Sequence, residues 1–577
     1  MARKTIGELR SQRWYARDDM RAFSHRQRTQ QMGFRREEFL GKPVIAVINT
    51  WSEMSPCHAH LRDRAAVAKR GIWEAGGFPV ELPALSVGEV LVKPSTMLYR
   101  NFLAMETEEL LRSHPIDGAV LLGGCDKSTP GLLMGAFSMD LPAIYCPAGA
   151  MANGRWRKAK VGAGTHTKKY WDELRAGAIT PADWIELESR GTRSTGTCNT
   201  MGTASTMTSI ADAMGMCMFG ASSIPAVDSA HSRMVAAAGS RIVEMVLEDL
   251  RPSTLVTRAS VMNAVAVDMA LGGSTNAAIH LIAMAGRLGI PLSLDDLDAV
   301  ARRVPLLANL FPAGENLMED FWFAGGLPAL MKKIAGDLDL GQSCVDGRTL
   351  RDHLADAPCW DDDVIRGRDD PVVPLSRGRT LVVLRGNLAP DGAVMKTTAA
   401  TAPLLKHRGP ALVFDDADDM ARRIDDPDLD VTEDTVLVLR NAGPVGAPGM
   451  PEWGNLPIPK KLLKRGVRDM VRLSDARMSG THYGACVLHV APEAAVGGPL
   501  SLLRTGDMVS LDAEAGRIDM EVDESELAIR RAAWKPPAET HARSWSSLYK
   551  RHVTQADKGC DFDFLEGAGG VPEPTIF

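Results

Sequence analysis

The stretch Pro43–Asn49 (PVIAVIN) is a short apolar run that ends on a polar residue, and it sets the pattern for the first half of the chain. An apolar run of this length with polar boundaries predicts a buried strand. Similar runs recur at Phe78–Leu82 and Asp117–Leu122, while Leu61–Ala75 and Thr96–Ser113 between them have the pattern of amphipathic helices. Strands that alternate with helices at this spacing predict a mainly parallel α/β sheet.

We expect this α/β pattern to extend to about Gly336. Open parallel sheets bind ligands in the loops beyond the carboxyl ends of their strands. The polar segments after Asn49, Leu82 and Leu122 are therefore the places where we expect a functional site.

The second half of the chain has a different pattern of apolar and polar residues. Residues Gly341–Val373 lose the periodicity and carry Asp and Pro, which is typical of a linker or an excursion from the fold. Six strand-like runs follow, at 380–384, 411–414, 435–439, 470–473, 508–511 and 517–522. We predict a β-rich, barrel-like or swivelling domain there. The expected division is an α/β domain over 1–375 and a β domain over 376–577.

Bulk composition excludes several classes of protein. The 577 residues are 45% hydrophobic and 24% charged, as in globular proteins, and the net charge of -6 gives no basic field for a nucleic acid. The Arg-rich stretch 10–36 is interpreted as a solvated or subunit-contacting arm. We expect no membrane span and no signal peptide, and the nine thinly spread cysteines favour reduced thiols in the cytoplasm.

Three cysteines follow predicted strands or lie in glycine-rich turns: Cys57, Cys125 and Cys198. Their wide spacing matches no local zinc or ferredoxin signature. Taken from the residues alone, they are either buried apolar side chains or ligands of a metal group. Their polar, Gly- and Pro-rich surroundings favour ligands more than an ordinary core position would.

Three carboxylates stand in comparable places. Asp126 follows a predicted strand, Glu89 follows the neighbouring one, and Glu452 lies in a Gly/Pro-rich loop. Carboxylate oxygens are the ligands that Mg²⁺ prefers. The alternatives are that Lys127 only pairs with Asp126, and that the loop carboxylates are merely solvated.

Two further segments contain groups that could take part in catalysis or binding. Ser479 lies in a turn after the predicted strand Met470–Leu473, where it could act as a nucleophile or a base, and the absence of a GxSxG elbow argues against a hydrolase triad. The run Gly272–Asn276 opens an apolar helix, which predicts either an anion site or a helix cap.

Taken together, these segments resemble the dihydroxy-acid and sugar-acid dehydratase family, which includes phosphogluconate dehydratase. The matching runs occur in order over nearly the whole chain. They are PCHAHL (56–61), GGCDKSTPGLLMGA (123–136), TGTCNTMGTAST (195–206), LGGSTNAAIHL (271–281), LRGNLAPDGAV (384–394), GPVGAPGMPE (443–452) and SDARMSGTHYG (474–484). The third run, with CDFDFLEG (560–567), looks closest to the sugar-acid branch, such as arabinonate or xylonate dehydratases.

The resemblance implies a role for each matching residue. The thiols of Cys57, Cys125 and Cys198 become ligands of a [2Fe–2S] cluster. Mg²⁺ is bound by a set of oxygen ligands: Glu89, Asp126, Glu452 and a carbamylated Lys127. Ser479 is implied as the base that removes a proton, and Thr481 as a substrate contact. One departure is His58, where Asn is frequent in the family.

The resemblance also implies the reaction. A sugar acid with hydroxyls on C2 and C3 loses its C2 proton and, with help from iron, its C3 hydroxyl, which gives a 2-keto-3-deoxy acid. The alternatives are the dihydroxy-acid dehydratase of branched-chain amino-acid biosynthesis and, remotely, a non-catalytic iron–sulfur sensor. We expect a homodimer or homotetramer that acts on a small-molecule substrate.

Overall fold

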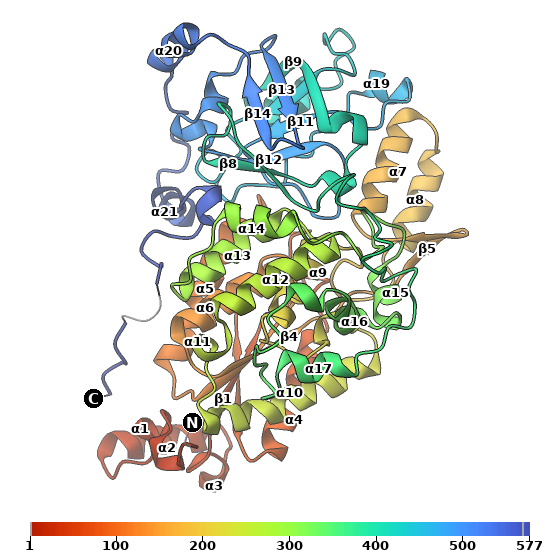
Figure 1. The fold of residues 1–577 in the computed structure, drawn as a ribbon. Coiled ribbons are helices and arrows are strands. Elements are labelled where there is room, and N and C mark those ends of the chain that lie inside the picture. Colours follow the sequence, from red (N-terminus) through yellow and green to blue (C-terminus); the bar gives the residue numbers. More distant parts are fainter. Residues whose placement is uncertain (1–2, 568–570, 577) are drawn as a thin grey trace.

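The computed structural model describes residues 3–567 and 571–576. In Figure 1 the first two thirds of the chain form the lower part of the molecule, and the last third forms a β-rich part above it. This arrangement of a parallel α/β part and a barrel-like C-terminal part confirms the predicted fold class.

The N-terminal sheet has four parallel strands in the order β2-β1-β3-β4. Their bounds are β1 Val44–Asn49, β2 Phe78–Pro83, β3 Gly118–Gly123 and β4 Ala143–Pro147. Every residue of β1 and β3 is buried, which explains their unbroken apolar sequences. Parallel neighbours need crossover connections, and these are the helices α4 (Leu61–Glu74), α5 (Met97–Ser113) and α6 (Ser128–Met139).

Beyond β4 the described chain up to residue 355 is mainly helical. A small hairpin, β5 (Gly154–Trp156) and β6 (Ala159–Val161), precedes a series of helices. They are α7 Thr165–Ala176, α8 Pro181–Arg190, α9 Thr203–Ala213, α10 Ser229–Glu248, α11 Pro252–Leu255, α12 Arg258–Leu271, α13 Asn276–Arg287, α14 Leu294–Ala301, α15 Met318–Phe323, α16 Gly326–Lys333 and α17 Leu350–Ala355.

The predicted extent of the alternating pattern, to about Gly336, was therefore too long. The parallel sheet ends at Pro147, and the later apolar runs are helices. In α12, eleven of fourteen residues are buried, so the helix has no polar face to give it a period of 3.6. Periodicity alone does not separate a buried helix from a buried strand.

The segment predicted as a linker or excursion is attached to the helical part. Apart from α17 it has no helix of its own, and isolated bridges pair Val373 with Leu306 and Ile365 with Ala308. It therefore behaves as an excursion that packs back on the N-terminal part.

The C-terminal sheet has eight strands in the order β14-β13-β9-β10-β11-β12-β8-β7. Their bounds are β7 Val382–Leu384, β8 Gly392–Met395, β9 Lys406–Phe414, β10 Val436–Leu439, β11 Arg472–Ser474, β12 Cys486–Ala491, β13 Met508–Asp512 and β14 Arg517–Met520. A bridge between Arg385 and Arg517 brings the two edges together and nearly closes the sheet. The short helices around it are α18 Ala417–Arg423, α19 Lys460–Lys464, α20 Glu524–Ala533 and α21 Ser544–His552.

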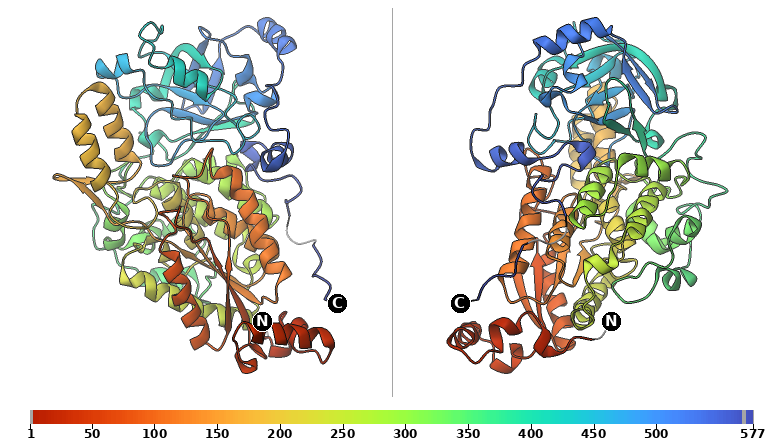
Figure 2. Two further views of the ribbon diagram at one scale, coloured as in Figure 1. Left: turned by 180° about the vertical axis from the view of Figure 1, so that it is seen from behind. Right: turned by 60° about the vertical axis from the view of Figure 1, so that its left-hand side comes forward.

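Two elements hold the parts together. Helix α7 rises beside α19, where Arg175 forms an ion pair of 2.6 Å with Asp425 (Figure 1). The segment after α21 runs down beside the lower part (Figure 2). There the buried Arg100 donates to the carbonyls of Gly559 and Cys560, and the buried Arg287 pairs with Asp561 at 2.6 Å.

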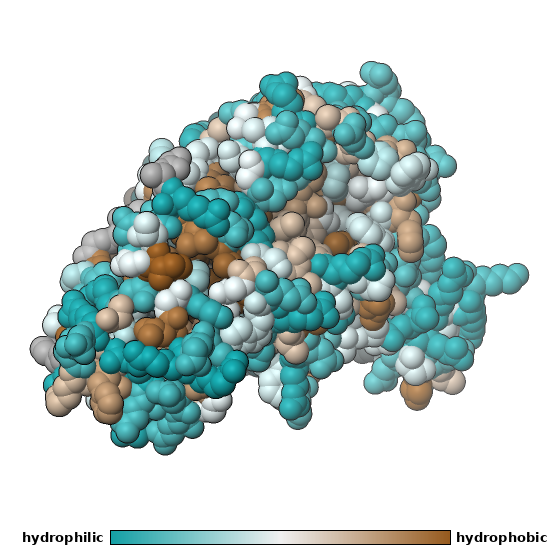
Figure 3. All heavy atoms as spheres, turned by 90° about the horizontal axis from the view of Figure 1, so that it is seen from below, coloured by the Kyte–Doolittle hydropathy of each residue, from teal (hydrophilic) through white to brown (hydrophobic). Residues whose placement is uncertain are grey.

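The N-terminal arm contains α1 (Gln12–Tyr15), α2 (Met20–Gln31) and α3 (Arg36–Phe39). It exposes the apolar side chains of Met20, Phe23 and Met32. Figure 3 shows separate apolar patches on the mostly hydrophilic lower face. Among the described residues, no helix combines the length and the apolar character that a membrane crossing requires. The subunit-contacting role of the arm stays a prediction.

Candidate metal and catalytic site

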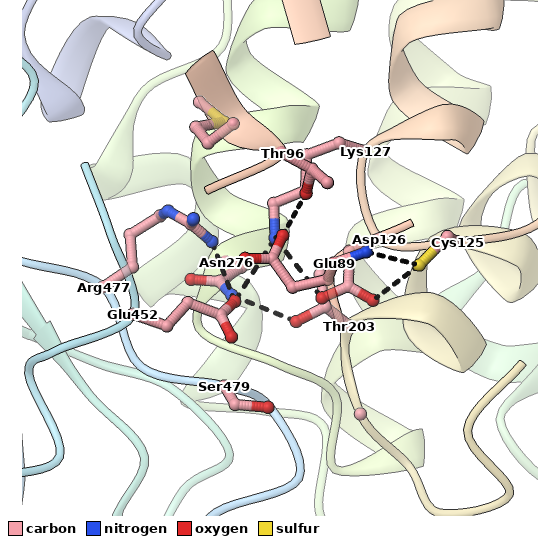
Figure 4. A network of polar contacts seen from close by, with 12 residues as sticks. Glu89, Thr96, Cys125, Asp126, Lys127, Thr203, Asn276, Glu452, Arg477 and Ser479 are labelled. Carbon is pink, nitrogen blue, oxygen red and sulfur yellow. Dashed lines mark hydrogen bonds and ion pairs between the residues drawn. The ribbon is translucent and has the colours of Figure 1, made fainter. Parts of the chain in front are cut away.

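Three carboxylates from distant parts of the chain meet where the two parts of the molecule join. Asp126 lies in the turn between β3 and α6, Glu89 lies in the loop after β2, and Glu452 lies in the loop after β10. One oxygen of each lies within 4.8 Å of the others. The arrangement is visible in Figure 4. Three hard oxygen donors at this separation fit a divalent cation such as Mg²⁺.

The Lys127 ammonium lies among these carboxylates. Its Nζ is 3.0 Å from Glu89 Oε2 and 3.3 Å from both Asp126 Oδ2 and Glu452 Oε1. Burial and Arg477 lower the pKa of Lys127, but the three carboxylates raise it by more, so the ammonium form is stabilised. Burial raises the pKa of Asp126 to about 6. The ammonium thus supplies a positive charge where a bound cation would otherwise supply it.

Glu452 is held by two further side chains. The fully buried Arg477 donates from Nη1 to Glu452 Oε1 at 2.9 Å, and Asn276 Nδ2 donates to the same oxygen at 3.0 Å. Arg477 also donates to Ser95 Oγ at 2.8 Å, and that hydroxyl donates to Glu89 Oε1 at 3.2 Å. A chain of hydrogen bonds therefore joins the carboxylate of the C-terminal part to one of the N-terminal part.

Arg477 was not predicted as a site residue, and Asn276 was predicted only as the end of a run that forms either an anion site or a helix cap. Both lie inside sequence runs that carry the family resemblance, so the signal was present in SDARMSGTHYG and LGGSTNAAIHL. The sequence does not show that either residue lies close to Glu452 in space. Asn276 contacts Glu452 across 176 positions of the chain.

The three predicted cysteines lie close enough to affect one another's ionisation. Cys57 follows β1, Cys125 follows β3, and Cys198 precedes α9. A hydrogen bond with Cys125, burial, and repulsion from Cys125 and Cys198 raise the pKa of the Cys57 thiol. Burial, Asp126 and Cys125 raise the pKa of the Cys198 thiol. Three neighbouring sulfur donors fit an iron–sulfur cluster, and the Glu89 N–H, 3.5 Å from Cys125 Sγ, joins this group to the carboxylates.

Ser479 and Thr481 lie in the loop after β11. Figure 4 shows Ser479 beside Glu452. Their hydroxyl oxygens are 2.9 Å apart, and the Thr481 carbonyl accepts a hydrogen bond from Thr165. Between them, Gly480 packs so closely that a Cβ would lie 2.6 Å from the Ser274 side chain and 2.7 Å from Thr203 N. Only glycine allows this loop to sit against the starts of α9 and α13.

The comparisons with known proteins cover nearly the whole chain. The model of the N-terminal domain of dihydroxy-acid/6-phosphogluconate dehydratases matches residues 42–353, and that of the C-terminal domain matches residues 363–560. The chain belongs to this dehydratase family. The predicted family and the predicted class of enzyme, a hydro-lyase, are therefore confirmed.

Individual relatives identify the branch. The chain is 68% identical to 6-deoxy-6-sulfo-D-gluconate dehydratase of Pseudomonas putida, with 99% of each chain covered. It is 48% identical to L-arabinonate dehydratase of Rhizobium leguminosarum, over 98% of this chain and 97% of the relative. The identity to dihydroxy-acid dehydratase of Acetivibrio thermocellus is 36%, with 93% and 96% covered. The predicted sugar-acid branch is confirmed, and it fits better than the branched-chain alternative.

Proposed function

We propose that this dehydratase converts a sugar acid with hydroxyls on C2 and C3 into a 2-keto-3-deoxy acid. The observation that carries the proposal is the meeting of three carboxylates and three thiols beside the Ser479 loop. Among sugar acids, we propose a gluconate with an anionic group on C6 as the first candidate, because the 68% identical relative is named for 6-deoxy-6-sulfo-D-gluconate. L-Arabinonate is the second candidate, on the strength of the 48% identical relative.

We further propose the cofactors and where they bind. Cys57, Cys125 and Cys198 would hold a [2Fe–2S] cluster. Mg²⁺ would be held by the oxygen ligands Glu89, Asp126, Glu452 and carbamylated Lys127. When bound, Mg²⁺ would supply positive charge next to the substrate carboxylate, and the cluster iron would supply a Lewis acid for the C3 hydroxyl.

The protein residues account for the proton steps. Ser479 acts as its alkoxide, stabilised by nearby positive charge: Oγ takes the C2 proton and becomes a hydroxyl, and the C3 hydroxyl leaves with the electrons of its C–O bond, so that one water is lost in total. The Thr481 hydroxyl, 2.9 Å from Ser479 Oγ, orients the base. The enol that results takes up a proton at C3 and becomes the ketone. Reaction in D₂O should therefore place deuterium on C3 of the product.

We propose that the site lies between a domain at 1–375 and a domain at 376–577, because Glu452 and Ser479 come from the second and the other ligands from the first. A cytoplasmic location is supported by the nine cysteines, all of which are free thiols. The homodimer or homotetramer stays a prediction.

A substrate panel tests the proposed function. Anaerobically purified protein is assayed with 6-deoxy-6-sulfogluconate, gluconate, arabinonate and xylonate, and with 2,3-dihydroxy-3-methylbutanoate as the branched-chain comparison. A pocket that hydrogen-bonds sugar hydroxyls rejects an analogue that lacks them, so we expect kcat/KM for the best sugar acid to exceed that for the branched acid by about 10⁴-fold or more. A preference for the branched acid would contradict the proposal.

The variant Lys127→Arg tests the carbamate. A carbamate forms when a neutral lysine amine adds to CO₂ and releases a proton, and it turns a cation into an oxygen ligand. Arginine keeps the positive charge among Glu89, Asp126 and Glu452 but cannot become an anion. We expect folded protein with normal iron and no turnover, measured by keto-acid formation.

Chelation of divalent cations is the companion measurement. In the wild type it should stop turnover while the visible absorbance persists, and added Mg²⁺ should restore activity. Wild-type turnover by Lys127→Arg would show that no carbamate is needed.

A further inference from the structure

His58 lies directly after Cys57 and is fully buried, with an exposed fraction of 0%. Its imidazole contacts segments that are far apart in the sequence. Nε2 is 3.2 Å from the backbone N of Cys125 and 3.2 Å from Ser128 Oγ, and Nδ1 is 2.8 Å from Ser86 Oγ. One side chain thus connects the loops after β1, β2 and β3.

The donors around the ring fix its tautomer. A backbone N–H can only donate, so Nε2 must accept the hydrogen bond from Cys125 and cannot carry a proton. The proton of the neutral ring then lies on Nδ1 and is donated to Ser86 Oγ. The ring is therefore neutral and has a distinct partner at each nitrogen.

Each contact of His58 holds a segment that carries a proposed metal or cluster ligand. The bond from Cys125 N–H fixes the turn that carries Cys125, Asp126 and Lys127 at the start of α6. The bond to Ser86 anchors the loop that leads to Glu89, whose own N–H donates to Cys125 Sγ. His58 also follows Cys57 directly, and its backbone N–H donates to the Ser55 carbonyl at 2.9 Å.

We infer that His58 is a positioning residue that holds the Cys57, Cys125 and Glu89 loops in one arrangement and so sets how firmly iron is retained. It acts through the acceptor at Nε2, because this atom satisfies the buried Cys125 N–H. The inference rests on the proposed cluster. Residues that orient metal ligands typically change metal affinity by about 10–100-fold when they are replaced.

Two variants separate the acceptor from the shape of the side chain. In His58→Gln the amide oxygen reaches about as far as Nε2 and can accept from Cys125 N–H, whereas His58→Leu fills the space without any acceptor. His231→Leu is the matched control, because His231 is also fully buried and bonds a backbone group, the Pro147 carbonyl, at 2.8 Å.

The measurement is iron per chain after anaerobic purification and the rate at which a strong iron chelator bleaches the visible absorbance. Thermal unfolding checks that each variant is folded. We expect His58→Leu to lose iron at least about tenfold faster than the wild type, and His58→Gln and His231→Leu to stay within about threefold of it.

The outcomes distinguish this inference from the proposed function. A wild type without iron would contradict the proposed cluster. If the wild type holds iron and His58→Leu retains it equally well, the positioning role is wrong. Equal loss from His58→Leu and His231→Leu would indicate general destabilisation and overturn the inference, and equal loss from the Gln and Leu variants would overturn the role of the acceptor.

Discussion

Replacing Cys125 with serine is expected to give colourless protein without iron and without measurable dehydratase activity. The Cys125 thiol is 3% exposed, lies beside the Cys57 thiol, and receives a hydrogen bond from the Glu89 N–H. A serine hydroxyl has nearly the same size but does not ionise to a soft ligand. Iron analysis and visible absorbance are the measurements, and the wild type should contain about two irons per chain.

Cys344→Ser is the control for this variant. Cys344 is also buried, but it lies between α16 and α17, and none of the three proposed ligand thiols is among the groups that shift its pKa. The Cys344→Ser protein should keep the colour and the activity of the wild type. Normal iron in Cys125→Ser would rule out the proposed cluster ligand.

The second large effect is expected for Ser479→Ala. If Ser479 is the base, kcat should fall by roughly 10²–10⁴-fold while iron and Mg²⁺ contents stay normal. Exchange of the substrate C2 proton with D₂O, where the wild type catalyses it, should also stop. Thr481→Ala should cause a smaller loss, because Thr481 is proposed to contact the substrate and to orient the Ser479 hydroxyl, 2.9 Å away, rather than to take the proton.

The alternative for Ser479 is a turn residue without a chemical role. Its replacement would then cost about 1 kcal/mol of stability and little rate. Near-normal kcat in Ser479→Ala would shift the role of base to His482. Burial lowers the pKa of His482 to about 4, so its ring is neutral above that pH and able to accept a proton.

Whether an element could be predicted from the sequence depended largely on how it is buried. β1 and β3 are buried on both faces and bounded by polar residues, so their short apolar runs could be recognised as strands. α12 is buried on nearly all sides and gave no helical period. β8 and β12 were missed, although they are as fully buried and at least as long as β7 and β10, which were predicted.

The candidate site was predicted through motifs rather than through geometry. The resemblance named Glu89, Asp126, Lys127 and Glu452, and the structure brings these four side chains together. The same motifs contain Arg477 and Asn276, but no local pattern says that they reach Glu452. Contacts across the join between two parts of a chain depend on how the parts dock, and a single sequence does not encode that in any periodic signal.

In the proposed form with a carbamylated Lys127 and bound Mg²⁺, the buried pocket would carry the same charge as in the ammonium form. In the form described here, one ammonium balances part of the charge of three carboxylates. A carbamate together with Mg²⁺ has the same total charge as that ammonium, since one negative and two positive charges replace one positive charge. A carbamate without Mg²⁺ would gather four anions away from water, and Mg²⁺ without the carbamate would meet the Lys127 ammonium at the same three carboxylates, and each arrangement is costly. CO₂ and the metal ion should therefore bind with positive cooperativity, each raising the affinity for the other by the same factor.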